Sequence, residues 1–458
     1  MTTMTQSGEP NPLPSAVVGA SQETHAPGRR PYLKGQSIAV IGAGVTGLAA
    51  ARTLATEGVD PKLITVFEKN AEPGGKVETI QVDDRDYELG AAVIVPGRHK
   101  VIEALARMHG LTTRRLGKGQ QLDVLTGKPT PERTFLENVR LIFLIVRYAA
   151  LYYRRFRGFL SPLGYCDIPL ELKRTWPQFV KKQRLEGMDQ AVAAVVGGSG
   201  YLRPDDPPQA AQIARLLRVS SILGLIVKGV RAFNAGGFQE LLRRETTALQ
   251  GLGVRFEFGG TVTEIARGDR TILIIDGEQR EFDHVFYTAD LSYLGHLLAG
   301  ASPSELRLFG RVSSYDYRCY ILRADGLPNE SRSYAAGIVP NMFQGVSERP
   351  VLIVKPYADT RIYLVYAYGE DTSTDASIAA AISAELARFG GAVGEVVRAK
   401  RWSYFPHVRD DLEGFFQAVM DLQGVGGLWV AGEATSLGLS VDAYEQGRDF
   451  ARLFLRSP

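Results

Sequence analysis

Three glycines and one glutamate near the start of the chain have the types and spacing of a dinucleotide site. Gly42, Gly44 and Gly47 follow the apolar run IAVI, and Glu68 ends the next apolar run, 21 residues beyond Gly47. The glycines of a GxGxxG turn let the backbone approach a pyrophosphate, whose charge is stabilised by the N-terminus of the next helix. A carboxylate at the position of Glu68 accepts hydrogen bonds from an adenosine ribose and repels a 2′-phosphate.

This chemistry requires a strand, a tight turn and a helix in that order. Residues 37–58, SIAVIGAGVTGLAAARTLATEG, have this pattern, because an apolar β-type run leads into the glycines and small apolar residues follow at helical spacing. Glu68 then ends a second predicted strand. The pattern favours a dinucleotide site over a glycine-rich turn without a ligand.

The composition is that of a soluble α/β protein with more than one domain. The 458 residues suggest two or three domains of about 100 to 200 residues each. The net charge of +3 gives no electrostatic case for binding nucleic acid. Cys166 and Cys319 have no CxxC spacing and no nearby histidine cluster, so neither a disulfide framework nor a metal site is expected.

Two segments bear on the location of the protein. Residues 1–36 lack the apolar core of a signal peptide and are predicted to be a disordered tail. The two isolated cysteines fit a reducing cytoplasm, with membrane association as a further possibility. No run of 18 apolar residues occurs, so a membrane span is not expected. Residues 137–160 join apolar runs to five arginines. This composition is typical either of an interfacial helix, at the entry for an apolar substrate and in peripheral contact with a membrane, or of a core-packing helix with a solvated basic end.

Two further segments resemble a known superfamily. Gly74 and Gly75 stand in AEPGGKVETI, six residues past Glu68, and Gly90 stands in YELGAAVIVP. Together with the glycine fingerprint they resemble the FAD-binding start of the amine oxidase and phytoene desaturase superfamily, whose paired glycines pass close to the flavin's phosphate and ribityl portion. The resemblance favours FAD over NAD. No Cys or His stands in a recognisable flavinylation sequence, so we expect non-covalent binding.

The last residues extend this resemblance. In that superfamily the C-terminal segment returns to the FAD domain, which here implies a strand at 428–431, a turn at Gly432 and Glu433, and a helix starting near Ser440. The N-terminus of such a helix can stabilise negative charge on a reduced flavin. Residues 231–268 resemble the segment that brings a strand residue near the adenine, and Val262 is the candidate for that contact. The alternative for the C-terminus is a helix that only docks on the domain.

The resemblance implies an α/β fold with a Rossmann-type, amine oxidase-like FAD-binding domain and an inserted α+β substrate domain. The FAD-binding domain is expected to combine residues 37–105, 226–290 and 401–458. Residues 106–225 and 291–400 are expected to form the substrate-binding domain, with a helical portion.

The predicted cofactor-binding residues come from these segments. They are Gly42, Gly44, Val45, Thr46, Gly47, Glu68, Lys69, Gly74, Gly75, Lys76, Gly90, Ala91, Ala92, Val262, Gly432, Glu433, Ser440 and Val441. No second glycine fingerprint follows a strand, because GGSG at 197–200 and GGAVG at 390–394 lack the preceding strand and the later glutamate. A domain for NAD(P)H is therefore not expected.

Several patches resemble the bacterial polyenoic fatty acid isomerases more closely. WxYFPH at 402–407 and AGExxSxG at 431–438 are the more specific matches, and Lys76 stands where the wider superfamily commonly has arginine. Between 106 and 200 the resemblance is loose. That family implies a redox-neutral use of FAD, in which a hydride leaves the carbon between two double bonds and returns to one end of the delocalised cation. Such chemistry needs a dry pocket and no dedicated protein base.

Two other functions stay open. The first is net oxidation or desaturation of a lipid, terpenoid or amine, and the second is an FAD-containing scaffold without turnover. The amine oxidase branch often has a flavin-facing lysine on the strand that matches SSYDYRCYILRA. This segment contains Arg318 and Arg323 but no lysine, and Lys355 lies on a later predicted strand.

The expected substrate is small and apolar, and a free fatty acid would need a cation for its carboxylate. Arg98, Arg114 and Arg115 lie near the position of an arginine thought to hold the carboxylate in the isomerases. The sequence does not choose among them, and each is alternatively a solvated surface arginine.

Three residues of the YFPH motif are candidates for the substrate or the chemistry. Tyr404 and Phe405 are predicted to line the flavin or the acyl chain, because aromatic rings supply large apolar area. His407, like Tyr404, is a weak candidate for a catalytic role, since imidazole titrates near neutral pH. The alternative is a hydrogen-bonded structural histidine.

Overall fold

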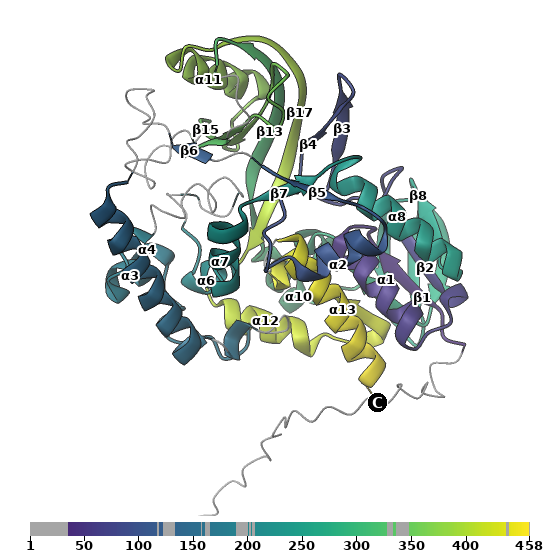
Figure 1. Cartoon of the computed structure of the whole chain (residues 1–458). Helices are drawn as coiled ribbons and strands as arrows, with labels where there is room; N and C mark the ends of the chain where they lie inside the picture. Colours follow the sequence, from purple (N-terminus) through teal and green to yellow (C-terminus); the bar gives the residue numbers. More distant parts are fainter. Residues whose placement is uncertain are drawn as a thin grey trace, which may run out of the picture.

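A parallel sheet of five strands organises the first part of the fold (Figure 1). In the computed structural model its order is β18 (Leu428–Val430), β12 (His284–Tyr287), β1 (Ile38–Ile41), β2 (Ile64–Glu68) and β8 (Arg255–Phe258). All residues of β1 and β2 are buried, as expected for strands covered on both faces. The structure describes residues 35–116, 119–121, 133–156, 158–160, 165–188, 200, 203, 207–327, 333–335, 348–436 and 439–457.

Helices cover one face of this sheet and a small sheet covers the other. Ile38 and Val40 of β1 share a core with the helices α1 (Val45–Glu57), α2 (Lys100–Met108), α8 (Gly237–Leu252) and α13 (Ser440–Arg456). Ala39 and Ile41 point into a second core together with the antiparallel strands β9 (Val262–Ala266), β10 (Thr271–Ile275) and β11 (Glu278–Phe282). The result is a three-layer domain that holds the carboxyl ends of all five parallel strands at one edge.

A six-stranded sheet organises the second part of the fold. Its order is β17 (Ala392–His407), β13 (Ser313–Asp325), β16 (Ile362–Tyr368), β15 (Pro350–Val354), β14 (Ser333–Ala335) and β6 (Gly119–Gln121). The long strands β13 and β17 run from beneath α11 (Asp375–Arg388) toward the centre of the molecule (Figure 1). α11 packs on one face of this sheet through Ile378 and Ile382, while the opposite face joins the core shared with the parallel sheet.

Short elements connect these parts. The hairpin of β3 (Thr79–Val82) and β4 (Arg85–Glu88) and the pair β5 (Thr113–Arg115) and β7 (Arg231–Phe233) are antiparallel ribbons. The remaining helices include α3 (Phe135–Leu151), α4 (Trp176–Gln183), α6 (Ala210–Leu216), α7 (Val219–Lys228), α9 (Leu294–Leu297), α10 (Pro303–Gly310) and α12 (Leu412–Asp421). In the part of the chain that the structure describes, no single helix is long and apolar enough to cross a membrane, although α6 and α7 pass that test together as a pair bent by 43°.

The fold class predicted from the sequence is confirmed, and three of the predicted segment boundaries fall inside single helices or strands. Residue 106 lies within α2, residue 226 within α7 and residue 401 within β17. β17 in particular is one continuous strand of the six-stranded sheet, and its C-terminal end carries the YFPH motif toward the parallel sheet. The predicted N-terminal tail lies outside the described residues, apart from its last two positions.

Candidate cofactor and substrate site

The turn between β1 and α1 has the geometry of a pyrophosphate cradle. Gly42 has a φ of 106°, which favours glycine. At Gly47 an added Cβ would lie 1.9 Å from the carbonyl oxygen of Gly42, so only glycine lets α1 start this close to β1. Throughout its described first turn α1 has neither a capping side chain nor an acidic residue. Its first amide groups, at Val45 and Thr46, are therefore available to an anion.

The paired glycines close the other side of this cradle. The amide of Gly74 donates to the carbonyl of Ala43 at 3.1 Å, and Gly75 Cα lies 3.6 Å from where a Cβ on Gly44 would stand. Glu68, at the end of β2, is 6% exposed, and its carboxylate accepts a hydrogen bond from the amide of Ala43 at 2.9 Å. Glu68, the carboxylate predicted to bind the ribose, thus lies at the same edge of the sheet as both glycine motifs, as an adenine dinucleotide requires.

The segment that contains Lys76 meets the strand that contains Gly90. The amide of Ala91 donates to the carbonyl of Lys76 at 2.9 Å, and a Cβ on Gly90 would lie 2.1 Å from that same oxygen. Glycine is therefore needed for this close contact. Ala92 follows Ala91, and Lys69 directly follows Glu68 at the end of β2. The contacts predicted for Ala92 and Lys69 with the cofactor stay predictions.

The C-terminal segment lies against the same edge. β18 pairs with β12 in the parallel sheet, and Gly432 follows it with its amide donating to Oε1 of Gln446 at 3.1 Å. α13 begins at Ser440, and no side chain of the described residues caps its N-terminus. The amides at Ser440 and Val441 therefore point out of a helix end that favours negative charge. Val262 starts β9, three residues after Gly259, whose amide donates to the carbonyl of Glu68 at 2.8 Å.

An ion pair joins the two ends of the chain inside the site. The ammonium of Lys76 donates to the carboxylate of Glu433, which lies 357 residues further along the chain. Lys76 Nζ also lies 5.5 Å from the ring centroid of Tyr404. Burial raises the pKa of Glu433, and the ammonium of Lys76 acts against that rise. Burial likewise raises the pKa of Tyr404, so its phenol stays protonated at neutral pH.

Aromatic rings cover the face of the six-stranded sheet that looks toward this ion pair. Tyr317 lies 5.2 Å from Tyr404, 5.8 Å from Tyr366 and 5.1 Å from Tyr368, measured between ring centroids. Tyr317 of β13 pairs directly with Tyr368 of β16, and Tyr366 is two residues before Tyr368, while Tyr404 of β17 pairs with Tyr315, two residues before Tyr317. Their rings therefore share one face of the sheet. The sequence analysis missed this surface, although the spacing of two between tyrosines in YDY and YAY could have indicated it.

A cationic cleft opens at the end of the β3–β4 hairpin. Its volume is about 540 Å³, and its lining is Arg85, Arg114, Arg115, Leu116, Asn234, Pro356, Tyr357, Ala358 and Asp359. The guanidinium of Arg114 donates to the carbonyl of Pro356 at 3.1 Å and lies 4.5 Å from the ring centroid of Tyr357. Arg85 pairs with Asp359 at 2.7 Å, whereas Arg115 is exposed. Three guanidinium groups against one carboxylate make the cleft suitable for an anion.

The third predicted arginine has a different environment. Arg98 is 5% exposed and forms an ion pair with Asp442 of α13, with Glu445 at 3.6 Å. It is absent from the cationic cleft. Its charge is balanced inside the protein, so Arg98 serves to hold α13 against the turn before α2. Neither Arg85 nor Tyr357 was predicted.

Acid is expected to destabilise the protein through His99. This ring is 1% exposed, its Nδ1 accepts a hydrogen bond from the amide of Val95 at 2.7 Å, and burial together with the neighbouring Arg98 lowers its pKa from 6.5 to about 4. Because the unfolded chain binds the proton more readily, the free energy of unfolding should fall by about 3 kcal/mol as pH drops through this window. Urea unfolding at a series of pH values measures the decline. His99→Asn keeps an acceptor and should flatten it, and an unchanged decline in that variant contradicts the assignment.

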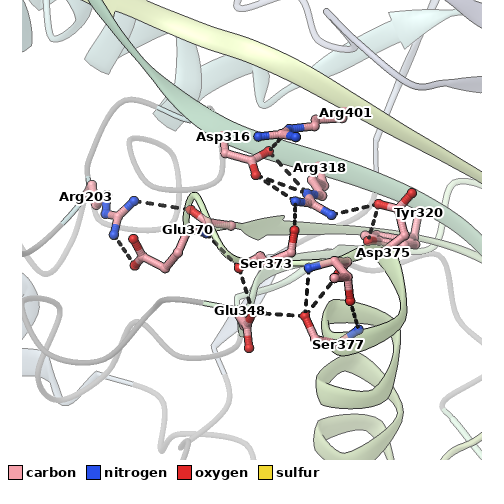
Figure 2. Close-up of polar contacts among 12 residues, drawn as sticks. Arg203, Asp316, Arg318, Tyr320, Glu348, Glu370, Ser373, Asp375, Ser377 and Arg401 are labelled. Atoms are coloured by element: carbon pink, nitrogen blue, oxygen red, sulfur yellow. Dashed lines mark hydrogen bonds and ion pairs between the residues drawn. The ribbon is translucent and has the colours of Figure 1, made fainter.

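The basic residues on or near β13 do not face the ion pair of Lys76 and Glu433. Figure 2 shows Arg318 bound to Asp316 and Asp375, with Nη2 to Oδ2 of Asp316 at 2.8 Å and Nη1 to Oδ1 of Asp375 at 2.7 Å. Arg323 forms an ion pair with Asp83. Lys355 Nζ lies 5.4 Å from the ring centroid of Tyr363, which belongs to the core under α11. Lys355 is thus on the far face of the sheet.

The YFPH motif contains an irregularity of β17. Tyr315 pairs with Tyr404 and Ser313 pairs with His407, so β17 has one residue more than β13 between these pairs. This bulge leaves Phe405 with a φ of 47° and buries its ring. The Nδ1 atom of His407 lies 2.8 Å from the carbonyl oxygen of Phe405, and its ring lies 4.6 Å from that of Tyr315. This environment fits the structural alternative for His407.

The fold and the site together define a dinucleotide-dependent oxidoreductase. The defining features are the three-layer domain, the glycine turn for a pyrophosphate, Glu68 for a ribose, and the C-terminal strand β18 that returns to the parallel sheet. A comparison with family models then gives the family. The model described as flavin containing amine oxidoreductase matches residues 45–455, and the chain belongs to this family. Its cofactor is FAD, as the residues of the cradle allow.

Two curated relatives are carotenoid desaturases by name. The 4,4′-diapophytoene desaturase (4,4′-diaponeurosporene-forming) of Staphylococcus haemolyticus is 26% identical over 323 residues, which cover 62% of this chain and 61% of that protein. The zeta-carotene-forming phytoene desaturase of Myxococcus xanthus is 26% identical over 63% of this chain and 60% of that protein. The chain therefore matches about three-fifths of the length of these relatives.

Solved structures share the whole fold. The CLA-producing fatty acid isomerase from P. acnes has a TM-score of 0.83 at 21% identity, covering 92% of this chain and 99% of that one. Putrescine oxidase bound to putrescine has a TM-score of 0.66 at 16% identity, again covering 92% and 99%. At these identities the likeness shows the fold, and with the family match it confirms the resemblance predicted from the sequence.

Proposed function

We propose that this protein is an FAD-dependent isomerase that moves the double bonds of a polyunsaturated fatty acid into conjugation. The observation that carries the proposal is that the cationic cleft and the aromatic face beside Lys76 lie at the two ends of one short strand, β4. The cleft fits a carboxylate, and the aromatic face fits an apolar chain. A free fatty acid has both parts.

β4 lies between the cleft and the aromatic face. Arg85 stands at the cleft, and Glu88 stands at the other end of the strand, about 10 Å away at the usual rise per residue. There the hydroxyl of Tyr366 donates to the carbonyl of Glu88 at 3.3 Å, and the indole of Trp402 donates to the carbonyl of Leu89 at 2.8 Å. Two residues after Leu89, the amide of Ala91 donates to the carbonyl of Lys76 at 2.9 Å. A carboxylate at the cleft would therefore leave the middle of an acyl chain near the aromatic face.

The protein groups in this site suit a reaction without a dedicated base. Bound FAD would supply the abstraction and return of a hydride at the carbon between two double bonds. Lys76 and Glu433 neutralise each other, and the phenol of Tyr404 stays protonated. The tyrosines exclude water and shape the space for the chain. The arginines of the cleft fix which carbon is presented.

Net desaturation or oxidation is the second candidate. The names of the curated relatives favour it, because they are desaturases of apolar polyenes. An amine substrate has less support, since Lys355 packs against Tyr363 on the far side of the sheet and β13 contains no lysine. The solved isomerase and the YFPH and AGE motifs favour isomerisation.

Incubation with linoleate in the absence of oxygen separates the two candidates. An isomerase should form a conjugated diene over many turnovers, followed by ultraviolet absorbance, and the visible spectrum should show oxidised flavin at the end. A desaturase or oxidase without an acceptor should bleach the flavin once and stop. Bleaching without a conjugated product would overturn the isomerase proposal, and turnover that starts only when oxygen or a quinone is added would support the second candidate.

A further inference from the structure

Helix α3 presents a continuous apolar stripe to solvent. The exposed side chains follow helical spacing along one side of the helix: Phe135, Leu136, Val139, Ile142, Phe143 and Val146. The exposed fraction is 80% for Phe135 and 63% for Phe143. Scattered exposed apolar residues are normal, but a stripe over three turns of one helix is typical of a binding surface.

The opposite side of α3 attaches the helix to the protein. Leu144 and Tyr148, one turn apart, are its only buried residues in the described range. Arg147 Nε donates to the carbonyl of Gln183 at 2.8 Å, which ties α3 to the end of α4. The helix is therefore held in place by its inner side while the apolar stripe remains outside.

Basic residues lie on α3 and on the neighbouring helix α4. Lys181, Lys182 and Arg184 at the end of α4 are exposed beside the point where Arg147 makes its contact. Residues 133–156 and 165–188, which contain α3 and α4, hold ten Lys or Arg against four Asp or Glu. This excess of six exceeds the net charge of +3 of the whole chain. The segments that contain α3 and α4 thus carry a larger positive excess than the chain as a whole.

We propose that α3 docks the protein on the surface of an anionic phospholipid bilayer. The apolar stripe would enter the boundary between headgroups and acyl chains, and the basic residues would contact the headgroups. Charge decides between the two occupants of such a surface. A second copy of the chain would present the same positive excess and be repelled, whereas an anionic bilayer is complementary. No described single helix can span the membrane, so the helix lies in its plane.

Vesicle sedimentation with the FAD-loaded full chain tests this proposal. We expect binding to vesicles of phosphatidylcholine with about one-third phosphatidylglycerol, at least tenfold weaker binding to phosphatidylcholine alone, and loss of binding in high salt. The double substitution Leu136→Ser and Phe143→Ser should weaken binding at least tenfold. Lys181→Glu with Lys182→Glu should do the same.

Leu252→Ser is the matched control, because Leu252 is 49% exposed at the end of α8, on the FAD-binding domain. It should leave vesicle binding unchanged. Flavin absorbance and thermal unfolding verify that every variant is folded. Failure of the wild type to bind anionic vesicles, or equal binding by the wild type and the stripe variant, overturns the proposal. A dimer in light scattering that the stripe variant dissociates, without vesicle binding, would instead assign the stripe to a second copy of the chain. None of these results depends on the fatty acid reaction.

Discussion

Replacing Gly44 with valine is expected to leave the protein folded and to remove FAD. A Cβ at Gly44 would have Gly75 Cα as its nearest neighbour at 3.6 Å, with Gly74 O and Gly75 N at 3.9 Å, all at ordinary van der Waals distances. The φ of −79° at Gly44 is open to any residue. The protein itself therefore tolerates a side chain here. A pyrophosphate at the N-terminus of α1 does not, because the second glycine of the fingerprint is where the backbone comes closest to it.

Gly47→Ala is the informative comparison. Its Cβ would lie 1.9 Å from the carbonyl oxygen of Gly42 and 2.8 Å from the hydroxyl of Thr288, so α1 has to move away from β1. This variant should lose stability even as apoprotein. Flavin absorbance per protein and thermal unfolding of the apoprotein measure the two effects. We expect Gly44→Val to bind FAD at least tenfold more weakly with an apoprotein transition near that of the wild type, and Gly47→Ala to unfold at lower temperature.

Full FAD occupancy in Gly44→Val would show that the turn is only structural. Equal losses of apoprotein stability in Gly44→Val and Gly47→Ala would also contradict the prediction. It assumes that a Cβ at position 44 points toward the pyrophosphate, whereas a Cβ at position 47 points into the protein. Both outcomes leave the identity of the substrate untouched.

The FAD-binding half of the site could be predicted because its parts are local. Gly42 and Gly75 have positive φ angles, and Gly47 and Gly74 leave no room for a Cβ, so both glycine motifs leave a mark in the sequence. The return of β18 needed more than local pattern. It followed from the resemblance, since nothing near Glu433 indicates that Lys76 is its partner.

The substrate half could not be predicted in the same way. The cationic cleft combines Arg85 from a hairpin, Arg115 from a short ribbon and Tyr357 from a loop, and no spacing along the chain connects them. Arg98 shows the opposite problem. Its position shortly after YELGAAVIVP made it a candidate for binding the carboxylate of a ligand. Its ion pair with Asp442, near the other end of the chain, gives it a structural role instead. Pairing across long sequence separation decides whether a charged residue is available to a ligand.

Arg115→Met is expected to reduce turnover of a fatty acid far more than turnover of its methyl ester. Arg115 is exposed in the cleft, whereas Arg114 is held by the carbonyl of Pro356 and the ring of Tyr357. Methionine keeps much of the length and removes the charge. A hydrogen bond to a charged group contributes about 1.5 to 3 kcal/mol, so kcat/KM for the acid should fall roughly tenfold to a hundredfold. The ester, which has no charge to hold, should change by less than about threefold.

Arg114→Met and Arg98→Met complete the set. Arg114→Met should also lower kcat/KM for the acid, because the guanidinium of Arg114 lines the same cleft. Arg98→Met leaves Asp442 buried with its main partner removed, so this variant should lower the thermal unfolding temperature and affect acid and ester alike. The apolar tail alone can bind tightly in any register, since each buried methylene contributes about 0.8 kcal/mol. If Arg114→Met and Arg115→Met both treat acid and ester equally, the carboxylate is not held at the cleft, and a neutral polyene becomes the better substrate.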